Sequence, residues 1–357
     1  MKILHLYTDL KIPCGITKTI HYMVRFRQAD SQHWVYSKSN SVPELFNGYC
    51  ENTFISTTKS TNIFSLIADV YNIIKVVKKN DIDILHSHHR YFDLAAYFTS
   101  KILKIPTICT VQSKVTGRKI FSYKSDKLVC VGSAIKKHLT GYFGVNPGKI
   151  TVIHNFVVPE DFQYSVDRVT LRKNLTLPEV SNLFLFVGRL HKEKAVDILI
   201  KAFSELIKKN QDCFLLFIGD GTEKSFLETE ILKNSIPAKI IKPQLDIFNY
   251  YLLADFVVLP SRVDPFPLVV LETGFACKPF IGTNVDGIAE MIEPGIHGIL
   301  TEPENVEELS NAMETAVENK AGCIKMAECF NRKVLSEFTV EKVLPEYYKL
   351  YASMMKN

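Results

Sequence analysis

The sequence has no run of about 18 apolar residues, which is the length that a membrane-spanning helix needs. Its longest apolar stretch, YYLLADFVVLP, is short and contains Asp255. The first ten residues, MKILHLYTDL, are too short and too polar for a secretory leader, so we expect none. The eight cysteines form no CxxC pair and no Cys/His zinc spacing. We therefore expect reduced, mostly buried thiols in a cytoplasmic protein.

The chain also lacks a short internal repeat, a low-complexity tract and the GxGxxG pattern of nicotinamide-cofactor enzymes. The nearest glycines, Gly219 and Gly221 in IGDG, are more typical of a plain turn after a strand. The length of 357 residues predicts about two domains. A hydrophobic content of 46% is enough for two sizeable cores.

Positive charge is concentrated in the first half of the chain. Residues 1–175 hold 24 Lys and Arg against 12 Asp and Glu, whereas the remainder holds 19 against 26. Residues 101–150 alone carry ten cations and one acid. Such asymmetry indicates that one half meets an anionic surface or ligand, although a solvated basic face is the commoner explanation of a charge run. We expect no nucleic-acid partner.

Strand-like and helix-like segments alternate in both halves, which predicts α/β layers around parallel sheets. The predicted strands are 1–7, 83–88, 106–112, 126–132, 149–155, 183–190, 213–221, 238–243, 255–260 and 279–283. The predicted helices are 15–28, 63–80, 133–144, 195–210, 223–234, 245–254 and 267–277. The pattern is lost at 156–182, so we expect two Rossmann-like domains, 1–165 and 166–340, whose sheets face each other across a ligand-binding cleft. A helix at 341–357 should pack back toward the first domain.

The stretch PSRVDPFPLVVLE, residues 260–272, places two acids around an apolar run with three prolines. Pro265 and Pro267 exclude a central strand, because each lacks a ladder donor. Since proline is tolerated in a first helical turn, the pattern predicts a strand, a tight loop and a helix that begins near Pro267. Asp264 and that first turn would then lie at the carboxyl end of the strands, where doubly wound sheets bind ligands.

Two further segments follow predicted strands. FVGRLHKEK contains Gly188, Arg189 and Lys194, and an Arg fork beside a Lys charge suits a diphosphate. On its own, this piece fits a solvated loop better. In the first half, KIPCGITKT places Gly15 at a helix start, where free N–H groups attract an anion.

Two patterns could suggest a metal, but we expect no metal site. Asp81 and Asp83 of DID precede their strand, so they would point away from the ligand end. In HSHH, strand alternation puts His86 and His88 on one face, with no acid or cysteine cluster near in sequence. For His88, a polar contact at the mouth of the cleft and a purely structural role are nearly equally expected.

Taken together and in order, these segments resemble the retaining, nucleotide-sugar-dependent glycosyltransferases of the GT-B fold, in the large family with a Glu-x7-Glu signature. The resemblance covers most of the chain and is strongest at 183–300. It rests on FVGRLHKEK, FIGDG, LLADFVVLPSRVDPFPLVVLETG, KPFIGTNVDGIAEMI and GIHGIL, which occur in the family's order and spacing.

The resemblance implies roles for individual residues. Arg189 and Lys194 would neutralise the departing diphosphate, which is an electrostatic contribution to catalysis. Asp264 would act beside the hydroxyl groups of the donor sugar, and Glu272 would bind the nucleotide ribose. The other residues implied are Gly15, Gly188, Gly221, Phe266, Pro267, Leu268 and Val269 at the donor and His88 and Gln112 on the acceptor side.

Four departures from the family pattern stand out. The first acid is Asp264 rather than the commoner Glu, and Pro267 replaces a frequent Gly. Gln112 stands where many relatives have a His that lines the acceptor side, and Gln cannot act as an acid or base. Cys14 replaces one glycine of a Gly-Gly pair. The first half matches less well overall, which fits acceptor specificity in that half.

We therefore expect an enzyme that moves a sugar from a nucleotide diphosphate sugar to a glycan or lipid-linked acceptor with retention of configuration, in cell-surface polysaccharide or lipopolysaccharide assembly. No cofactor and no metal are expected, because fixed cations would replace the metal. An alternative is a non-catalytic nucleotide-sugar-binding subunit, which Gln112 and Cys14 motivate and the intact charged residues oppose. An epimerase of the same fold has no support in these motifs.

Part of the positive charge falls in SKVTGRKIFSYKSDK, residues 113–127, where Ile120, Phe121 and Tyr123 stand among cations. This mixture suits a segment that lies on an anionic bilayer. We expect an enzyme at the inner face of the cytoplasmic membrane. A basic face that only attracts anionic donors or glycans is the competing explanation.

Overall fold

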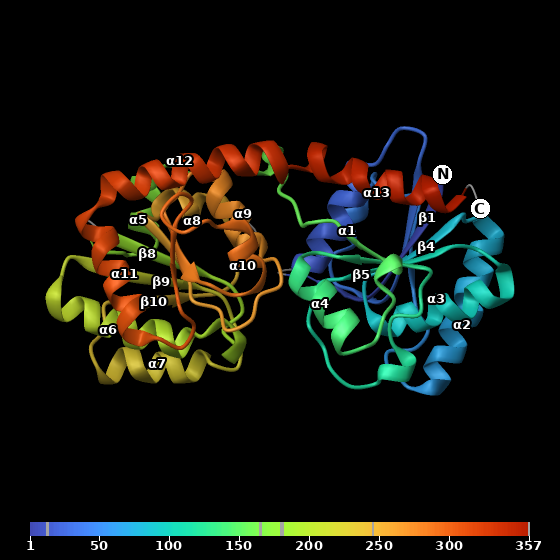
Figure 1. The fold of residues 1–357 in the computed structure, drawn as a ribbon, viewed down its shortest axis with the longest axis horizontal. Coiled ribbons are helices and arrows are strands. Elements are labelled where there is room, and N and C mark those ends of the chain that lie inside the picture. Colours follow the sequence, from blue (N-terminus) through green and yellow to red (C-terminus); the bar gives the residue numbers. More distant parts are fainter. Residues whose placement is uncertain (12–13, 164–165, 179–181, 245, 356–357) are drawn as a thin grey trace. The chain divides into compact units, whose positions relative to one another are not determined.

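The structure is a computed structural model of the chain, and it describes all residues except 12–13, 164–165, 179–181, 245 and 356–357. The chain divides into two compact units (Figure 1). Unit 1 comprises Met1–Asn155 and Val340–Asn357, and unit 2 comprises Phe156–Thr339. The boundary between the two domains was predicted between residues 165 and 166. Residue 165 lies outside the described residues.

Unit 1 is built on a parallel sheet with the strand order β3-β2-β1-β4-β5-β6-β7. Its strands are β1 Lys2–Leu10, β2 Gln32–Asn40, β3 Asn52–Ile55, β4 Ile84–Ser87, β5 Thr107–Val111, β6 Lys127–Cys130 and β7 Ile150–Val152. Its α-helices are α1 Gly15–Arg25, α2 Ile63–Asn80, α3 Arg90–Leu103, α4 Ser133–Gly141 and α13 Val340–Met355. Its 3-10 turns are η1 Pro43–Phe46, η2 Lys119–Phe121 and η3 Pro147–Lys149.

The two faces of this sheet carry separate cores, because successive strand residues point to opposite faces. Leu4, Tyr36 and Leu85 belong to the core that includes side chains of α2 and α3. Tyr7 and Val35 belong to the core that includes side chains of α1. Since α2 and α3 contact each other and cover the same face, their outward sides point in the same general direction.

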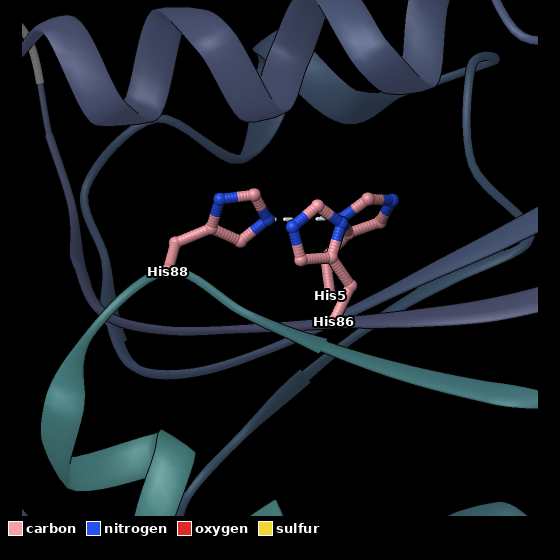
Figure 2. Close-up of side chains that lie close together, drawn as sticks. All are labelled: His5, His86 and His88. Carbon is pink, nitrogen blue, oxygen red and sulfur yellow. Dashed lines mark hydrogen bonds between the residues drawn. The ribbon is translucent and has the colours of Figure 1, made fainter. Parts of the chain in front are cut away.

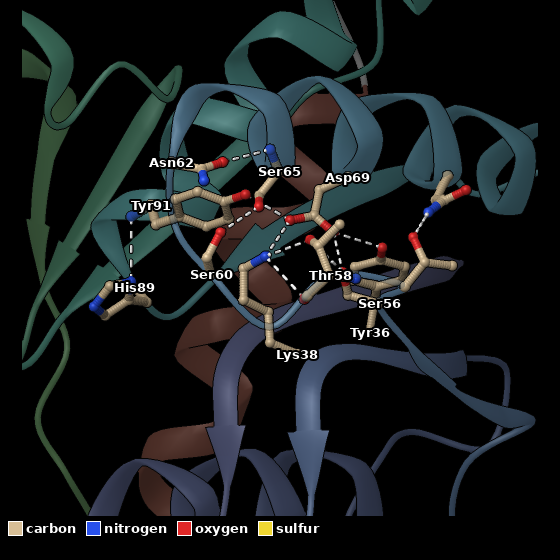
Figure 3. A network of polar contacts seen from close by, with 12 residues as sticks. Tyr36, Lys38, Ser56, Thr58, Ser60, Asn62, Ser65, Asp69, His89 and Tyr91 are labelled. Carbon is tan, nitrogen blue, oxygen red and sulfur yellow. Dashed lines mark hydrogen bonds and ion pairs between the residues drawn. The ribbon is translucent and has the colours of Figure 1, made fainter.

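A buried polar network fixes α2 to this face of the sheet (Figure 3). The fully buried carboxylate of Asp69 accepts hydrogen bonds from the hydroxyl groups of Tyr36 (2.8 Å) and Tyr91 (2.6 Å). It also pairs with the ammonium group of Lys38 at 2.6 Å. A buried charge is tolerated only when it is paired and hydrogen-bonded, so these partners fix the position and rotation of α2.

The C-terminal helix α13 packs within unit 1. Tyr351, which is fully buried, shares a hydrogen bond of 2.7 Å with Nδ1 of His86 on β4. The hydroxyl of Tyr348 lies 3.0 Å from both Ser31 Oγ and His33 Nε2 at the start of β2. Segments from the two ends of the sequence therefore share one core.

Unit 2 has a parallel sheet with the order β10-β9-β8-β11-β12-β13. Its strands are β8 Asn182–Val187, β9 Cys213–Ile218, β10 Ala238–Ile241, β11 Phe256–Leu259, β12 Phe280–Thr283 and β13 Ile299–Thr301. Its α-helices are α5 Arg168–Asn174, α6 Val196–Lys209, α7 Lys224–Lys233, α8 Phe248–Leu253, α9 Leu268–Phe275, α10 Asp286–Met291, α11 Val306–Glu318 and α12 Lys320–Glu337. Its 3-10 turns are η4 Pro159–Asp161 and η5 Lys192–Lys194.

The predicted α/β class, with a parallel sheet in each half, is confirmed. Among the helices of the described residues, none combines the length and the apolar character that a membrane crossing requires.

Candidate active site

At the carboxyl end of the unit 2 sheet, the backbones after β8 and β9 are in direct contact. The N–H of Gly188 donates to the carbonyl of Ile218 at 3.0 Å. A Cβ at Gly219 would lie 1.9 Å from the carbonyl oxygen of Gly188, and one at Gly221 would lie 2.3 Å from that of Leu190. Only glycine permits these approaches. The glycines of the two motifs therefore hold the loops that carry the predicted donor residues.

Lys194 and Asp264 form an ion pair at this end of the sheet. Lys194 lies in η5, after β8, and Asp264 lies in the loop after β11. Lys194 Nζ donates to Asp264 Oδ2, and the two side chains are only 15% and 9% exposed. Ser261 Oγ donates to the same carboxylate oxygen at 3.1 Å. The structure thus joins two of the predicted catalytic residues by a charge-assisted hydrogen bond.

Arg189, the other predicted cation, is exposed at the end of β8. Within the described part of the chain its guanidinium makes no hydrogen bond or ion pair. Its five donors are therefore open to a ligand, and a planar fork of this kind matches the oxygens of a diphosphate.

Arg262, which the sequence analysis did not single out, connects the same two loops. Its guanidinium donates to both carboxylate oxygens of Asp197 at 2.8 Å and also pairs with Glu304. Its backbone N–H donates to the carbonyl of Glu193 at 2.8 Å. Burial acts to raise the pKa of Asp197, but the Arg262 contacts outweigh it and lower that pKa. Arg262 therefore supports the loop that presents Asp264.

The predicted helix start near Pro267 is confirmed, since α9 begins at Leu268 with Pro267 as its N-cap. No side chain caps this end. The N–H groups of the first turn, including those of Leu268 and Val269, have no acceptor within the helix. The side chain of Phe266, just before the turn, is buried. The turn can therefore offer backbone donors to an anion.

Glu272 follows one turn later on α9 and is buried. The hydroxyl of the fully buried Tyr251, on α8, donates to Glu272 Oε2 at 2.8 Å. Burial, and then the nearby carboxylate, raise the pKa of Tyr251 well above its usual value. The phenol therefore stays protonated and orients Glu272. No signal in the local sequence marked Tyr251.

In unit 1, two predicted residues lie at the carboxyl ends of strands. Gly15 is exposed and is the first residue of α1, after the N-cap residue Cys14, whose side chain does not cap the helix. The neighbouring loop residues Ile12 and Pro13 lie outside the described residues. Gln112 directly follows β5, and its Nε2 atom is buried without a hydrogen-bond partner in the described structure. A ligand that accepts a hydrogen bond could therefore satisfy Gln112.

His88, expected at a cleft mouth or in a structural role, is buried in a histidine cluster (Figure 2). His88 Nε2 lies 3.1 Å from His5 Nδ1, and His5 Nε2 lies 2.8 Å from His33 Nδ1. Ring nitrogens of His5, His86 and His88 lie within 4.8 Å of one another. The sequence analysis missed His5 because β1 and β4 are neighbours in the sheet but distant in sequence.

The cluster is uncharged at neutral pH. Burial lowers the pKa of His5 to about 3 and holds the pKa values of His86 and His88 well below their usual range. His86 uses both ring nitrogens, in contacts of 2.7 Å with Tyr351 and Thr110. By contrast, the buried Nδ1 of His88 has no hydrogen-bond partner in the described part of the structure. The arrangement favours a neutral hydrogen-bonded network over a cation site.

Arg189, Lys194, Asp264 and Glu272 thus all follow or flank strand ends of unit 2, together with the glycines and the α9 turn. The remaining predicted residues, Gly15, His88 and Gln112, lie at the corresponding end of unit 1. The acids Asp81 and Asp83 lie between α2 and β4, at the opposite end of the unit 1 strands.

Comparison with protein families identifies both halves of the chain. The family described as "Glycosyl transferases group 1" matches residues 167–333. "Glycosyltransferase Family 4" matches residues 15–161. The two matches fall in unit 2 and unit 1, respectively, apart from a few residues at the junction.

Individual relatives cover most of the chain. A UDP-Gal:alpha-D-GlcNAc-diphosphoundecaprenol alpha-1,3-galactosyltransferase of Escherichia coli is 28% identical and covers 85% of this chain and 84% of its own. The crystal structure of a glycosyltransferase from Rickettsia africae superposes with a TM-score of 0.88 at 21% identity, over 100% of this chain and 99% of that one. The Anabaena protein HepE, solved with UDP-glucose, has a TM-score of 0.87 at 18% identity, over 99% and 100%.

Proposed function

This chain belongs to the group 1 glycosyltransferases of family 4, which are retaining, nucleotide-sugar-dependent enzymes. From that premise, we propose that it transfers a sugar from a uridine diphosphate sugar to a glycan or lipid-linked acceptor. The buried pair of Lys194 and Asp264 is the observation that carries the donor part. Arg189, close to Lys194 in sequence, is exposed and makes no hydrogen bond or ion pair within the described residues. The uridine base is supported by the names of the Escherichia coli relative and the Anabaena complex.

Unit 2 supplies the groups for the donor. Arg189 and Lys194 bind the diphosphate and stabilise the charge that develops on it as the glycosidic bond breaks. Asp264 orients Lys194 and accepts hydrogen bonds from the sugar hydroxyl groups. Glu272, held by Tyr251, accepts hydrogen bonds from the ribose.

The backbone of unit 2 completes this donor site. The N–H groups at Phe266, Leu268 and Val269 add donors to the phosphates and the sugar, on a turn that Pro267 stiffens. Gly188 and Gly221 leave room for the ligand at the strand ends. With two cations and this helix turn available, the diphosphate needs no metal ion.

Unit 1 supplies the acceptor side. Gln112 Nε2 and His88 Nδ1 are both buried and lack hydrogen-bond partners in the described structure, and both lie at strand ends. A hydroxyl group of the acceptor can accept from one of these nitrogens. Gly15, at the exposed start of α1, leaves room for the phosphates of the donor.

The name of one relative supports the proposed acceptor class. The Escherichia coli relative is named for an acceptor in which a sugar is linked to undecaprenol through diphosphate. A lipid-linked acceptor of that kind would fit a role in cell-surface polysaccharide or lipopolysaccharide assembly on the cytoplasmic side of the membrane.

A second candidate is a nucleotide-sugar-binding subunit without transferase activity. Gln112 favours it, because an amide cannot act as an acid or base. The two candidates agree on donor binding and differ only in turnover.

A thermal-shift screen with UDP-, GDP- and ADP-sugars tests the donor assignment, because a ligand that binds the native state raises its stability. We expect the largest shift with a UDP-sugar. Release of UDP upon addition of lipid-linked acceptors then separates the enzyme from the binding subunit. A larger shift with another base would overturn the uridine assignment, and binding without UDP release from any acceptor would favour the subunit.

A further inference from the structure

Large apolar side chains are exposed on the outward sides of α2 and α3. Phe64, Ile67 and Tyr71 on α2 are 78%, 63% and 58% exposed, and Phe98 and Ile102 on α3 are 42% and 61% exposed. The α2 residues recur at intervals of three and four, so they form one stripe along the helix. Among the described helices, α2 carries the most exposed large apolar side chains.

The stripe is not needed to hold α2 on the sheet. The opposite side of α2 buries Leu66, Ile73 and Val77 in the core and is fixed by the Asp69 network (Figure 3). Because α2 is anchored from that side, the outward apolar side chains gain nothing from intramolecular packing. A contiguous exposed apolar patch on an otherwise folded domain marks an interaction site.

Positive charge accompanies the stripe. The last turns of α2 and α3 carry five exposed lysines: Lys75, Lys78, Lys79, Lys101 and Lys104. The only acids within the two helices, Asp69 and Asp93, are fully buried. The exposed Asp81 at the end of α2 pairs with Lys2 at 3.7 Å. Both helices connect parallel strands and therefore run in the same direction, so the lysines gather at one end of the patch.

We propose that this apolar–basic face, defined as Phe64, Ile67, Tyr71, Phe98 and Ile102 with the five lysines, binds an anionic lipid bilayer. Apolar side chains enter the boundary between headgroups and acyl chains, and the lysines contact the anionic headgroups. Anionic headgroups would neutralise the five lysines, whereas α2 and α3 of a second copy would offer them no exposed acid, since Asp69 and Asp93 are buried.

The end of the face that carries Phe64 and Ile67 lies toward the carboxyl ends of the strands, whereas Phe98 and Ile102 lie near the lysines at the end of α3. The first turn of α2, with Phe64, follows the end of β3, and η2 follows the end of β5. Ile120 and Phe121 in η2 belong to the segment 113–127, which was predicted to lie on a bilayer. They are 75% and 60% exposed, so they add apolar side chains at the carboxyl end of the strands. Tyr123, expected among the membrane-contacting side chains, is instead buried, with its ring 4.8 Å from that of Phe143.

This inference stands on unit 1 alone and goes beyond the proposed reaction. If the membrane proposal and the proposed reaction both hold, the membrane lies near the carboxyl end of the unit 1 sheet, where Gln112 and His88 are. A lipid-linked acceptor could then reach these residues without leaving the bilayer.

Co-sedimentation of the full chain with vesicles tests the proposal. We expect binding to phosphatidylglycerol-containing vesicles, weak binding to pure phosphatidylcholine vesicles, and a decrease as salt screens the lysines. Lys75→Glu with Lys78→Glu should lower binding more than 25-fold, since one basic residue contributes about 1 kcal/mol, or about fivefold. Phe64→Ser with Ile67→Ser should lower it roughly tenfold, because two exposed apolar side chains no longer enter the bilayer.

Matched controls lie on α7 of unit 2. Phe226→Ser with Leu232→Ser removes exposed apolar side chains, and Lys233→Glu reverses an exposed charge. These variants should bind vesicles like the unmodified chain. Equal binding to both vesicle types, or equal loss in the α2 and α7 variants, would overturn the proposal.

Two further measurements distinguish membrane binding from self-association and from a loss of UDP binding. If Phe64→Ser with Ile67→Ser converts a dimer to a monomer in sedimentation velocity without changing vesicle binding, the face is a self-association surface and the membrane proposal is wrong. The UDP-induced thermal shift of every variant should match that of the unmodified chain. A chain that binds UDP but no vesicles would refute the membrane face and leave the proposed reaction standing.

Discussion

The two units share one architecture but differ in how they hold the polar groups at their carboxyl ends. In unit 2 these groups are charged: Lys194 pairs with Asp264, Arg262 pairs with Asp197, and Glu272 is fixed by Tyr251. In unit 1 the corresponding groups are neutral histidines buried beneath α13, and the amide of Gln112 follows β5, the strand next to β4 in the sheet. The exposed apolar stripe of α2 also belongs to unit 1.

Under the proposed function, this difference corresponds to a division of tasks. A donor diphosphate is always charged, so the unit proposed to bind it needs cations, and carboxylates hold Lys194 and Arg262 in unit 2. An acceptor is largely uncharged at its reacting hydroxyl, which neutral groups such as those of unit 1 can contact. The predictions below test this division, starting from the largest expected effect.

The strongest effect is expected at the two donor cations. Arg189→Ala and Lys194→Ala should each lower turnover about a hundredfold, since removal of one donor to a developing charge costs roughly 3 kcal/mol. Steady-state kinetics with a UDP-sugar measures this. Lys201→Ala, an exposed cation on α6, is the control. If both active-site variants keep near-normal turnover, unit 2 does not stabilise the leaving group through these side chains.

Substitutions of Glu272 and Asp264, the two acids of unit 2, should weaken the binding of different ligands. Glu272→Gln should weaken the binding of UDP itself about tenfold, because a charged acceptor of the ribose hydroxyls becomes a neutral amide. Asp264→Asn should weaken the intact UDP-sugar more than UDP. Titration calorimetry with both ligands measures the pattern. The same loss for both ligands in both variants would contradict the division of ribose and sugar.

The strands of unit 2 were more predictable from the sequence than those of unit 1, but its helices were less so. The sequence analysis missed α5, α10, α11 and α12 in unit 2 and only α3 in unit 1. The strands of unit 2, such as β8 and β9, are continuous apolar runs, and its glycines and prolines mark the strand ends. In unit 1, the sequence analysis missed β2 and β3, which are the last two strands at one edge of the sheet. The sequence of β2, QHWVYSKSN, mixes polar and apolar residues. The short strand β13, Ile299–Thr301, was missed as well.

The limits of sequence reasoning at the site have a physical cause. The motifs pointed to residues such as Lys194 and Asp264, which the structure places in contact with each other. They did not reveal the supporting side chains Tyr251 and Arg262, which act through contacts between elements far apart in sequence. The proximity of His5 to His86 likewise depends on the pairing of β1 with β4.

The histidines should make unit 1 less stable in acid than unit 2. Burial lowers the pKa of His5 to about 3, below the unfolded value of 6.5, so the unfolded chain binds more protons as pH falls through 6.5. Stability is then fully present above that pH and is lost below it. One such histidine contributes a slope of up to about 1.4 kcal/mol per pH unit.

The single tryptophan, Trp34, is buried in unit 1 and reports on its unfolding. Urea titrations at several pH values between 7.5 and 5, followed by Trp34 fluorescence, should show this acid-dependent loss. His5→Gln should reduce the slope even if it lowers stability at pH 7.5. A pH-independent midpoint for Trp34 would mean that the cluster is protonated or solvated in the folded state.

The smallest expected effect is that of metal removal, which should leave turnover unchanged. Under the proposed function, Arg189 and Lys194 of unit 2 supply the positive charge that a metal ion would otherwise supply. Among the described residues of unit 1, the histidine cluster is the group that could hold an ion, since ring nitrogens of His5, His86 and His88 lie within 4.8 Å of one another. Both ring nitrogens of His86 already have hydroxyl partners, and a divalent cation there would place two uncompensated charges in the core, which is costly. Elemental analysis of untagged protein before and after EDTA treatment, with turnover measured on the same samples, decides whether the histidine cluster holds a metal ion on which turnover depends. Stoichiometric zinc, lost on EDTA together with activity and absent from His86→Gln, would show that unit 1 relies on a bound cation and would overturn the contrast between a charged donor unit and a neutral acceptor unit.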